Sequence, residues 1–466
     1  MQPFPHSNFC QSIMFKKIEI WVLYLFLLLG FIFTVFFGAL VKYELHDGKF
    51  LEKYNLGWIA RAALFLAEIP GNSAKILDND NAVEDRFTSL AGFNGTPNSK
   101  ESYLLLSRYD GDFKEGVVEL IDLTNFNVLH TWNPDIDKFN SLVEQVDEFK
   151  FITQDNNNYR QTLKSPKLTK DGGLLFNSFP LRKINSCSEL IFQNTHNRFH
   201  HSIETDIDGN IWVPSRLYPH SLPSKMVGKD VESFKDDAIV KLDTNGKVIF
   251  EKSVSQIFID NGMEYLLFAI KSNDFPNDPI HLNDIQPVNS DTDYWKKGDV
   301  FLSLRNQSMV ILYRPSTNKI VWKFTGPLFF QHDVDILDNH SVSIFNNNNK
   351  NYIIGDIVDG HNEVIIYDFK TGNHTSYLKD SLVKNDVRTI NQGSGQILPN
   401  GDLYIEETNY GRTLYFNKDG SLKWQHINRA KDGNTYNVGW SQILYTKEDL
   451  KFVNDFLTNK INNCYE

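Results

Sequence analysis

Apolar runs of strand length alternate with turns rich in Asp, Asn and Gly from about residue 101 onward. Asp-Gly or Asn-Gly between two apolar runs predicts a β-hairpin, because these residues adopt the positive φ that a tight turn requires. Such hairpins are predicted over residues 168–179, 205–214, 241–252, 313–324, 335–345, 367–378, 397–407 and 415–426.

The hairpins are of two kinds that alternate along the chain, and one of each forms a four-stranded unit of about 40–60 residues. A repeat of that size and strand content is typical of a β-propeller blade. Six units fit between Tyr103 and His426, with a helical segment expected over 446–456. A β-sandwich is the alternative architecture, but the regular period argues against it.

One apolar segment differs from the strands in length. Residues 20–41 form 22 positions without a charge, enough for a helix to span a bilayer. Lys16 and Lys17 precede the segment, so the positive-inside rule places the N-terminus in the cytoplasm and residues 43–466 outside. A cleaved signal peptide is the rival interpretation, and Met14 is an alternative start.

The predicted fold class is therefore all-β: a six-bladed β-propeller preceded by a single N-terminal transmembrane helix. The expected domains are a cytoplasmic leader (1–19), the anchor (20–41), a stalk or cap (42–100), the propeller (101–440) and a helical tail (441–466). Within the stalk, residues 58–67 favour a short helix and residues 78–99 favour a loop.

Composition and charge narrow the function. The net charge is −11 and no long basic run is present, which argues against a nucleic-acid partner. Aromatic residues reach 13%, in keeping with a strand-rich protein. Of the three cysteines, only Cys187 and Cys464 follow the apolar segment, so at most one disulfide can form on the far side, and whether it does stays open.

Three of the thirteen histidines share a local context, in which a histidine is followed three residues later by an acidic residue: His201, His281 and His332. Each precedes the first strand of a repeat unit. The inner strands of propeller blades surround one channel, so residues at matched strand starts converge at one end of it. We therefore expect a histidine pocket, although each residue alone fits a structural role bonded to its acidic neighbour.

Arg305 lies one strand after His281, in the alternating run VFLSLR. It either faces solvent or binds an anion. Three imidazoles are suitable ligands for zinc or copper, but a neighbouring guanidinium repels a metal cation and so opposes its binding. The same groups suit a tetrahedral oxyanion, since Arg donates to two oxygens in a fork and an imidazole nitrogen is nucleophilic at neutral pH. We predict no metal and no cofactor.

Four segments carry a family resemblance: FHHSIETDIDGNIWV, IHLNDI, VFLSLRNQSMVILYRPSTNKIVWKFTG and QHDVDILDNHSVSIFNN. The motifs occur in the order His, His-x-Asn, Ser-x-Arg, Trp-x-x-x-Gly and Gln-His-Asp. In this order the chain resembles the bacterial arylsulfate sulfotransferase family over roughly residues 165–425. The resemblance implies a six-bladed periplasmic propeller that moves a sulfuryl group from an aryl sulfate to a phenol without a nucleotide donor.

By this resemblance, His332 is the nucleophile that is transiently sulfated. His281, Arg305 and His201 bind the sulfuryl oxygens or assist proton transfer, and His200 competes with His201 for its position. The implied partners are a small aryl sulfate, a phenol and, through the N-terminal helix, the inner (cytoplasmic) membrane. The physiological substrates and a homodimer stay open.

The sequence also departs from the family. The 42–100 region is too short and irregular for the N-terminal β-sandwich of periplasmic members, and the chain carries an anchor. Tyr294, Trp295 and Tyr410 are candidates to stack on an aryl substrate, although packing is the stronger interpretation of each. A metal-dependent propeller hydrolase or lactonase and a non-catalytic surface propeller are the alternative functions.

Overall fold

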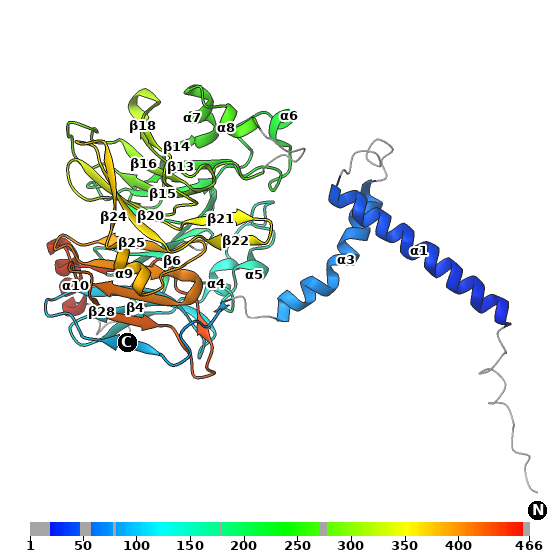
Figure 1. Ribbon diagram of the computed structural model, residues 1–466, viewed down its shortest axis with the longest axis horizontal. Coiled ribbons are helices and arrows are strands. Elements are labelled where there is room, and N and C mark those ends of the chain that lie inside the picture. The colour runs from blue at the N-terminus through cyan, green and yellow to red at the C-terminus, as the bar shows by residue number, and fades with distance from the viewer. Residues whose placement is uncertain (1–18, 47–56, 78–80, 178, 270–276, 460–466) are drawn as a thin grey trace, which may run out of the picture. The chain divides into compact units, whose positions relative to one another are not determined.

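The computed structural model describes residues 19–46, 57–77, 81–177, 179–269 and 277–459. The chain divides into two compact units, residues 1–80 and 81–466. Figure 1 shows helices in the first unit and mostly strands in the second.

The N-terminal unit contains two helices, α1 (Ile20–His46) and α3 (Gly57–Leu77), which contact each other. Over Ile20–Tyr43, α1 is long and apolar enough to cross a membrane, and side chains such as Phe26 are exposed. Its place near the N-terminus suits either an anchor or a signal sequence. The helix expected over 58–67 extends further, to Leu77.

The second unit is a six-bladed β-propeller, as the hairpin pattern predicted. All blades are antiparallel sheets, and the first three consist of the following strands, given from the channel outward. Blade 1 is β30 (Gln442–Leu444), β3 (Tyr103–Asp110), β4 (Glu115–Asp122) and β5 (Asn127–Trp132). Blade 2 is β6 (Lys164–Leu168), β7 (Leu174–Asn177), β8 (Leu181–Ile184) and β9 (Leu190–Asn194). Blade 3 is β10 (Arg198–Phe199) with β11 (Glu204–Thr205), then β12 (Ile211–Arg216), β13 (Asp237–Leu242) and β14 (Val248–Ser253).

The other three blades follow the same order. Blade 4 is β15 (Leu282–Pro287), β16 (Val300–Leu304), β17 (Met309–Arg314) and β18 (Lys319–Phe324). Blade 5 is β19 (Val334–Ile336), β20 (Ser341–Asn346), β23 (Glu363–Asp368) and β24 (Asn373–Tyr377), with the hairpin β21 (Asn349–Tyr352) and β22 (Gly355–Val358) inserted. Blade 6 is β25 (Ser394–Ile397), β26 (Leu403–Glu407), β27 (Arg412–Phe416), β28 (Leu422–Ile427) and β2 (Gly92–Gly95).

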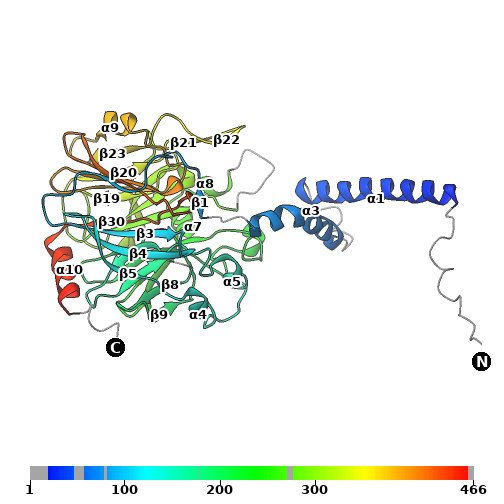
Figure 2. The same ribbon diagram turned by 90° about the horizontal axis from the view of Figure 1, so that it is seen from below.

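Short helices occupy the connections. The α-helices are α4 (Ile136–Asn140), α5 (Ile152–Asp155), α6 (Ser224–Val227), α7 (Val254–Asp260), α8 (Tyr265–Phe268) and α9 (Lys379–Lys384). Single 3₁₀ turns are η1 (Arg305–Gln307), η2 (Pro315–Thr317) and η3 (Thr408–Tyr410). At the C-terminal end, α10 (Lys447–Asn459) packs Val453 and Phe456 against Trp132 of blade 1 (Figure 2).

Segments near both ends of the second unit pair with strands of the ring. The propeller therefore extends beyond the boundaries expected for it, 101 and 440. At the C-terminal end, β30 pairs with β3 and closes blade 1, so residues 442–444 of the expected helical tail are a strand. At the N-terminal end, β1 (Ala82–Val83) pairs with β29 (Thr435–Tyr436), and β2 adds an outer strand to blade 6. The loop expected over 78–99 therefore contains two strands, because their outer partners supply hydrogen bonds that local sequence does not reveal.

The core lies between neighbouring blades. Inner and middle strands are buried on both faces, as in β16 and β17, and their apolar side chains fill the spaces between sheets. The outer strand β18 instead alternates exposed and half-buried positions. This packing holds the inner strands around the channel. The candidate histidines lie just before the starts of three of these strands.

Candidate active site

A ring of strained residues surrounds one end of the channel. At the start of each inner strand, or a few residues before it, a non-glycine residue has a positive φ between 52° and 60°: Ser165, His201, His281, Phe330, Gln392 and Trp440. Such conformations are uncommon outside glycine and concentrate at functional sites. We call this end of the propeller the histidine end.

Three of the predicted histidines meet there. The ring centroid of His201 lies 5.1 Å from that of His281 and 6.2 Å from that of His332. The indole of Trp440 lies 6.1 Å from His201 and 6.3 Å from His332, and it joins the cluster from blade 1. The structure thus places side chains from blades 3, 4 and 5 at one site.

His332 is the most buried of the three, with 1% of its surface exposed. Its Nδ1 donates to Asn347 Oδ1 at 2.7 Å and to the Phe330 carbonyl at 3.1 Å. A carbonyl oxygen can only accept, so the proton is on Nδ1 and Nε2 carries the lone pair. Nε2 accepts a hydrogen bond from the Gln392 backbone N–H at 2.9 Å.

The environment of His332 keeps the ring neutral. Burial, reinforced by the positive charge of Arg305, lowers the pKa of His332 to about 3. A neutral imidazole with its Nε2 lone pair directed away from its anchoring partner is the reactive form of a histidine nucleophile.

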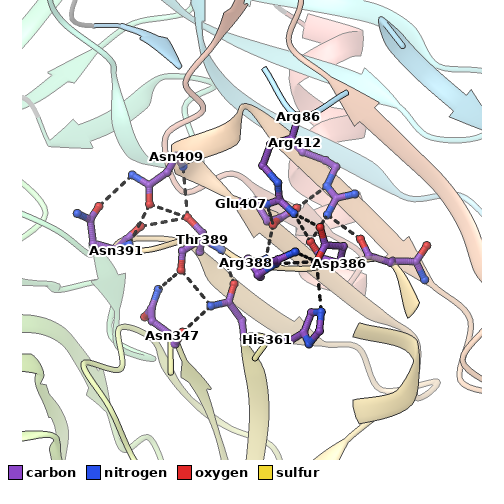
Figure 3. Close-up of polar contacts among 12 residues, drawn as sticks. Arg86, Asn347, His361, Asp386, Arg388, Thr389, Asn391, Glu407, Asn409 and Arg412 are labelled. Atoms are coloured by element: carbon purple, nitrogen blue, oxygen red, sulfur yellow. Dashed lines mark hydrogen bonds and ion pairs between the residues drawn. The ribbon is translucent and has the colours of Figure 1, made fainter. Parts of the chain in front are cut away.

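Asn347 is itself held in place by the loop that carries Gln392. Its Nδ2 donates to the Gln392 carbonyl at 2.8 Å and to the Thr389 carbonyl at 3.2 Å, and these carbonyls fix the orientation of the amide. Figure 3 shows Asn347 beside Thr389, with Asn391 and Asn409 on the far side of the threonine. The Asn347 side chain therefore links His332 to the loop that carries Thr389 and Gln392.

The same loop is anchored at its start by an ion-pair network, also drawn in Figure 3. Asp386 pairs with Arg86 at 2.5 Å and with Arg388 at 2.5 Å. Buried Glu407 pairs with Arg412 and accepts from the Arg388 backbone N–H at 2.6 Å. Arg86 comes from the N-terminal segment of the second unit, so that segment helps to fix the loop.

His281 forms an acid–histidine pair. Its Nδ1 donates to Asp278 Oδ2 at 2.7 Å, which leaves Nε2 as the free ring nitrogen. Burial of Asp278 opposes its ionisation, but the hydrogen bond with His281 and the charge of Lys235 hold its pKa well below the ordinary range. The carboxylate bound at Nδ1 fixes the orientation of the ring, an arrangement typical of a histidine that transfers protons at Nε2.

Arg305 lies next to these rings. Its backbone N–H donates to the His281 carbonyl at 3.0 Å, and its guanidinium lies 4.9 Å from the centre of the Phe330 ring. Its Nη1 donates to Asn306 Oδ1 at 3.1 Å, whereas buried Nε has no hydrogen-bond partner among the described residues. A half-buried guanidinium with an unpaired, buried Nε–H is a suitable partner for an oxyanion.

His200 and His201 have different positions. His200 lies behind His201, with 2.7 Å between their Nδ1 atoms, and its Nε2 is 3.2 Å from Asp237 Oδ1. Burial lowers the pKa of both rings, further for His201. It is His201 that contacts the other two histidines, so of the two candidates it occupies the shared site.

A cavity of about 170 Å³ opens beside His201. It is lined by His200, His201, Gln392, Trp440 and, from blade 2, Lys164. Burial lowers the pKa of Lys164, and the charge of Glu406 opposes that shift. The positive charge of Lys164 in turn acts on His201. Lys164 is thus a second cationic group at the histidine end.

The three candidates for aryl stacking lie elsewhere. Tyr294 and Trp295 belong to the 288–299 loop, at the opposite end of β15 from His281. Trp295 is 2% exposed and packs on Phe301 and Phe369 in the core. Tyr410 is at the histidine end, but its ring is buried beneath the Arg86 guanidinium at 4.4 Å. None of the three lines the cavity beside His201. Tyr294 and Trp295 pack in an apolar cluster, and Tyr410 stacks against Arg86.

Acidic residues fill the channel beyond the histidines. Asp284 Oδ2 accepts from the Val334 N–H at 3.0 Å, and Asp333 Oδ2 accepts from the Gly395 N–H at 3.2 Å. Burial, together with the nearby charge of Glu204, raises the pKa of Asp284 to about 8 and that of Asp335 to about 7. These carboxyls stabilise the protein best when protonated.

Within the described ranges, no group of three His, Cys, Asp or Glu side chains has the geometry to hold a metal ion. His332 illustrates why, since both of its ring nitrogens already bond to protein groups. Cys187 is disulfide-bonded, and the expected partner Cys464 lies outside the described residues.

Sequence reasoning missed four participants: Lys164, Asp278, Asn347 and Gln392. Asp278 has a readable signal, a carboxylate three residues before His281. Lys164 lies one blade away from His201, on which its charge acts, and Asn347 is held by carbonyls of the Thr389–Gln392 loop before the next blade. Gln392 contributes a backbone N–H, which any residue type would provide.

Comparison with known proteins gives the family. Among solved structures, a protein of unknown function from Bacteroides caccae is 14% identical, with 73% of this chain and 98% of that chain covered and a TM-score of 0.42. A virginiamycin B lyase from Staphylococcus aureus is 12% identical (59% and 86% covered, TM-score 0.33). The WD40 β-propeller domain of Doa1 is also 12% identical (80% and 95% covered, TM-score 0.36). These likenesses are too low to bear on activity.

No curated protein matches the chain. The arylsulfotransferase (ASST) family model, in contrast, matches residues 170–429, more than half of the chain and all the predicted catalytic positions. With the converging histidines and Arg305, this match shows that the chain belongs to the arylsulfotransferase (ASST) family.

Proposed function

We propose that the protein transfers a sulfuryl group from an aryl sulfate to a phenol through a sulfated His332, without a nucleotide donor. The observation that carries the proposal is the state of His332: a buried, neutral imidazole near the cationic Arg305, whose Nδ1–H is anchored and whose Nε2 lone pair is held only by the Gln392 backbone N–H.

In the first step, His332 Nε2 attacks the sulfur of the aryl sulfate. The N–S bond forms as the bond from sulfur to the aryl oxygen breaks, and the phenolate leaves with the bonding electrons. The Gln392 N–H that now occupies Nε2 must give way. Arg305 stabilises the charge on the sulfuryl oxygens, and His281, which enters the step with a proton on both ring nitrogens, donates its Nε2 proton to the leaving oxygen while Asp278 holds Nδ1–H.

In the second step, a phenol replaces the first product. His281 takes the phenolic proton while the acceptor oxygen attacks sulfur, and the N–S bond breaks to return its electrons to Nε2. The histidine and its protonated partner are thereby restored. Two in-line displacements at one sulfur need a single anion site, and we assign it to the Arg305 guanidinium beside the three histidines.

We further infer that α1 anchors the protein in the inner membrane and that the propeller acts on the extracytoplasmic side. The charge asymmetry around residues 20–41 supports this orientation. A homodimer stays open.

The test is a chromogenic aryl sulfate without added nucleotide, followed by phenol release and by retention of ³⁵S on the denatured protein. The native chain should release phenol and retain the label, and His332→Ala should do neither. His426→Ala is the matched control, because His426 is also buried and its pKa is also about 3, yet it contacts Phe93 in blade 6. Labelling of His332→Ala would overturn the proposal.

A further inference from the structure

The hairpin β21–β22 carries an apolar tip that the proposed reaction does not use. It leaves blade 5 between β20 and β23 and forms a two-stranded sheet of its own (Figure 1). At its turn Ile353 is fully exposed and Ile354 is 83% exposed, with Tyr352 and Ile357 partly exposed beside them. Adjacent exposed isoleucines on a protruding turn mark an interaction surface.

The hairpin rises from the histidine end. It begins two residues after Asn347, which bonds His332, and Asp356 on β22 acts electrostatically on Arg305. A second set of exposed apolar side chains lies at the same end, on the insert that carries α4 and α5. Leu142 is 64% exposed and Phe151 is 52% exposed, and Asn156 of this insert lines the cavity beside His201.

The point where the chain enters the propeller is also at this end. Asn81 Nδ2 donates to the Arg160 carbonyl at 3.0 Å, and Asn81 Oδ1 accepts from Thr162 Oγ1 at 3.5 Å. The neighbouring Gln161 lines the same cavity. The segment before Asn81 contains α1, the candidate membrane span. The entry point, the apolar tip and the active site therefore share one end of the propeller.

We propose that the tip of the β21–β22 hairpin inserts into the lipid bilayer. A convex tip of two isoleucines fits a fluid apolar medium. The hairpin presents no unpaired positive charge to anionic headgroups, since Lys350 pairs with Asp359 at 2.5 Å and Asp356 accepts from the neutral Asn351 at 2.7 Å. The contact is therefore hydrophobic, takes place with zwitterionic lipid and is insensitive to salt.

The position of the tip also indicates a substrate class, an inference that rests on the proposed function. Phe329, 40% exposed, lies 4.8 Å beneath the Lys350 ammonium at the base of the hairpin, and the adjacent Phe330 lies beneath Arg305. Two adjacent aromatic rings thus link the base of the hairpin to the anion site. They suit an amphiphilic phenol or aryl sulfate whose alkyl chain stays in lipid while its head reaches His332.

The first experiment measures lipid contact without catalysis. The full chain is reconstituted in phosphatidylcholine nanodiscs with a fluorescent amino acid at position 353 or, as a control, at exposed Thr371. The β20–β23 register places Thr371 at the opposite end of the propeller. We expect blue-shifted emission and quenching by spin-labelled lipid at 353 only, unchanged by salt. Unquenched emission at 353, or a signal that depends on protein concentration because a second copy covers the tip, would overturn the proposal.

The second experiment compares acceptors. In Ile353→Ser/Ile354→Ser, we expect KM to rise for a long-chain alkylphenol in vesicles and to stay unchanged for a water-soluble phenol. Ile249→Ser, on the outer strand β14, is the control and should change neither KM. Equal KM shifts for both acceptors would refute the substrate class. The absence of any sulfuryl transfer by the native chain would refute the proposed function. The lipid-quenching result at position 353 would still decide whether the tip contacts the bilayer.

Discussion

Asn347 offers the sharpest test of how the nucleophile is prepared. Asn347→Leu keeps the volume of the side chain but removes the acceptor of the His332 Nδ1 proton. The Phe330 carbonyl at 3.1 Å from Nδ1 and the Gln392 N–H at 2.9 Å from Nε2 then remain to favour that tautomer. A hydrogen bond of this kind contributes about 1 kcal/mol, and about 1.4 kcal/mol corresponds to a tenfold rate. We therefore expect sulfation of His332 to slow about fivefold.

Asn347→Asp makes the opposite change. A carboxylate at 2.7 Å from Nδ1 stabilises the imidazolium, so the pKa of His332 rises from about 3 toward the ordinary value. Because a protonated Nε2 cannot attack sulfur, activity in this variant should be lost at a higher pH as the solution is acidified. The native enzyme should not lose its nucleophile until the pH approaches 3.

The assay is the single-turnover burst of phenol from a chromogenic aryl sulfate, recorded by stopped flow between pH 4 and 9. Asn428→Leu is the control, since buried Asn428 also donates to backbone carbonyls, at 2.9 Å to Tyr109 and 3.1 Å to Tyr436, outside the site. It should lose stability but keep its burst rate. A full burst rate in Asn347→Leu, or an unmoved acid limb in Asn347→Asp, would refute the reasoning.

Three further predictions concern other groups. Asp278→Asn should slow the release of poor leaving groups far more than the release of nitrophenolate, because it removes the carboxylate that supports the proton donor His281. An equal loss of rate for every aryl sulfate in a leaving-group series would contradict this prediction. Lys164→Met should raise KM for aryl sulfate about tenfold, as expected for loss of a charge-assisted contact, with Lys164→Arg retaining most binding in the same titration. The pKa of Asp284 is raised, so its contribution to the free energy of unfolding is complete below about pH 4 and is lost as pH rises through about 8. The melting temperature of the native chain should therefore fall between pH 5 and 9, and Asp284→Asn should flatten that fall.

The blade pattern was predictable because each hairpin carries its own turn signal. The antiparallel pairs β13–β14, β17–β18 and β27–β28 form at the predicted turns. The strands β2 and β30 escaped prediction for the opposite reason, since both are short and pair with segments more than 300 residues away. Long-range pairing is decided by the closed ring and not by local preference.

The site follows the same division. His201, His281 and His332 could be selected because they repeat at equivalent places, and repetition is visible in a sequence. Asn347 could not, because its role depends on the Thr389 and Gln392 carbonyls of the next blade. Trp295 agrees with the packing interpretation that the sequence favoured, since this aromatic residue in an expanded turn lies in the core and does not line the cavity beside His201.

Ring closure by β30 has a consequence for the order in which the chain is made. Synthesis runs from the N-terminus, yet blade 1 lacks its inner strand until residues 442–444 are made. Trp440, which contacts His201 and His332, precedes that strand by two residues. A growing chain therefore holds every histidine of the site but no finished pocket. A chain truncated after residue 439 would leave an edge of β3 unpaired and open to other chains.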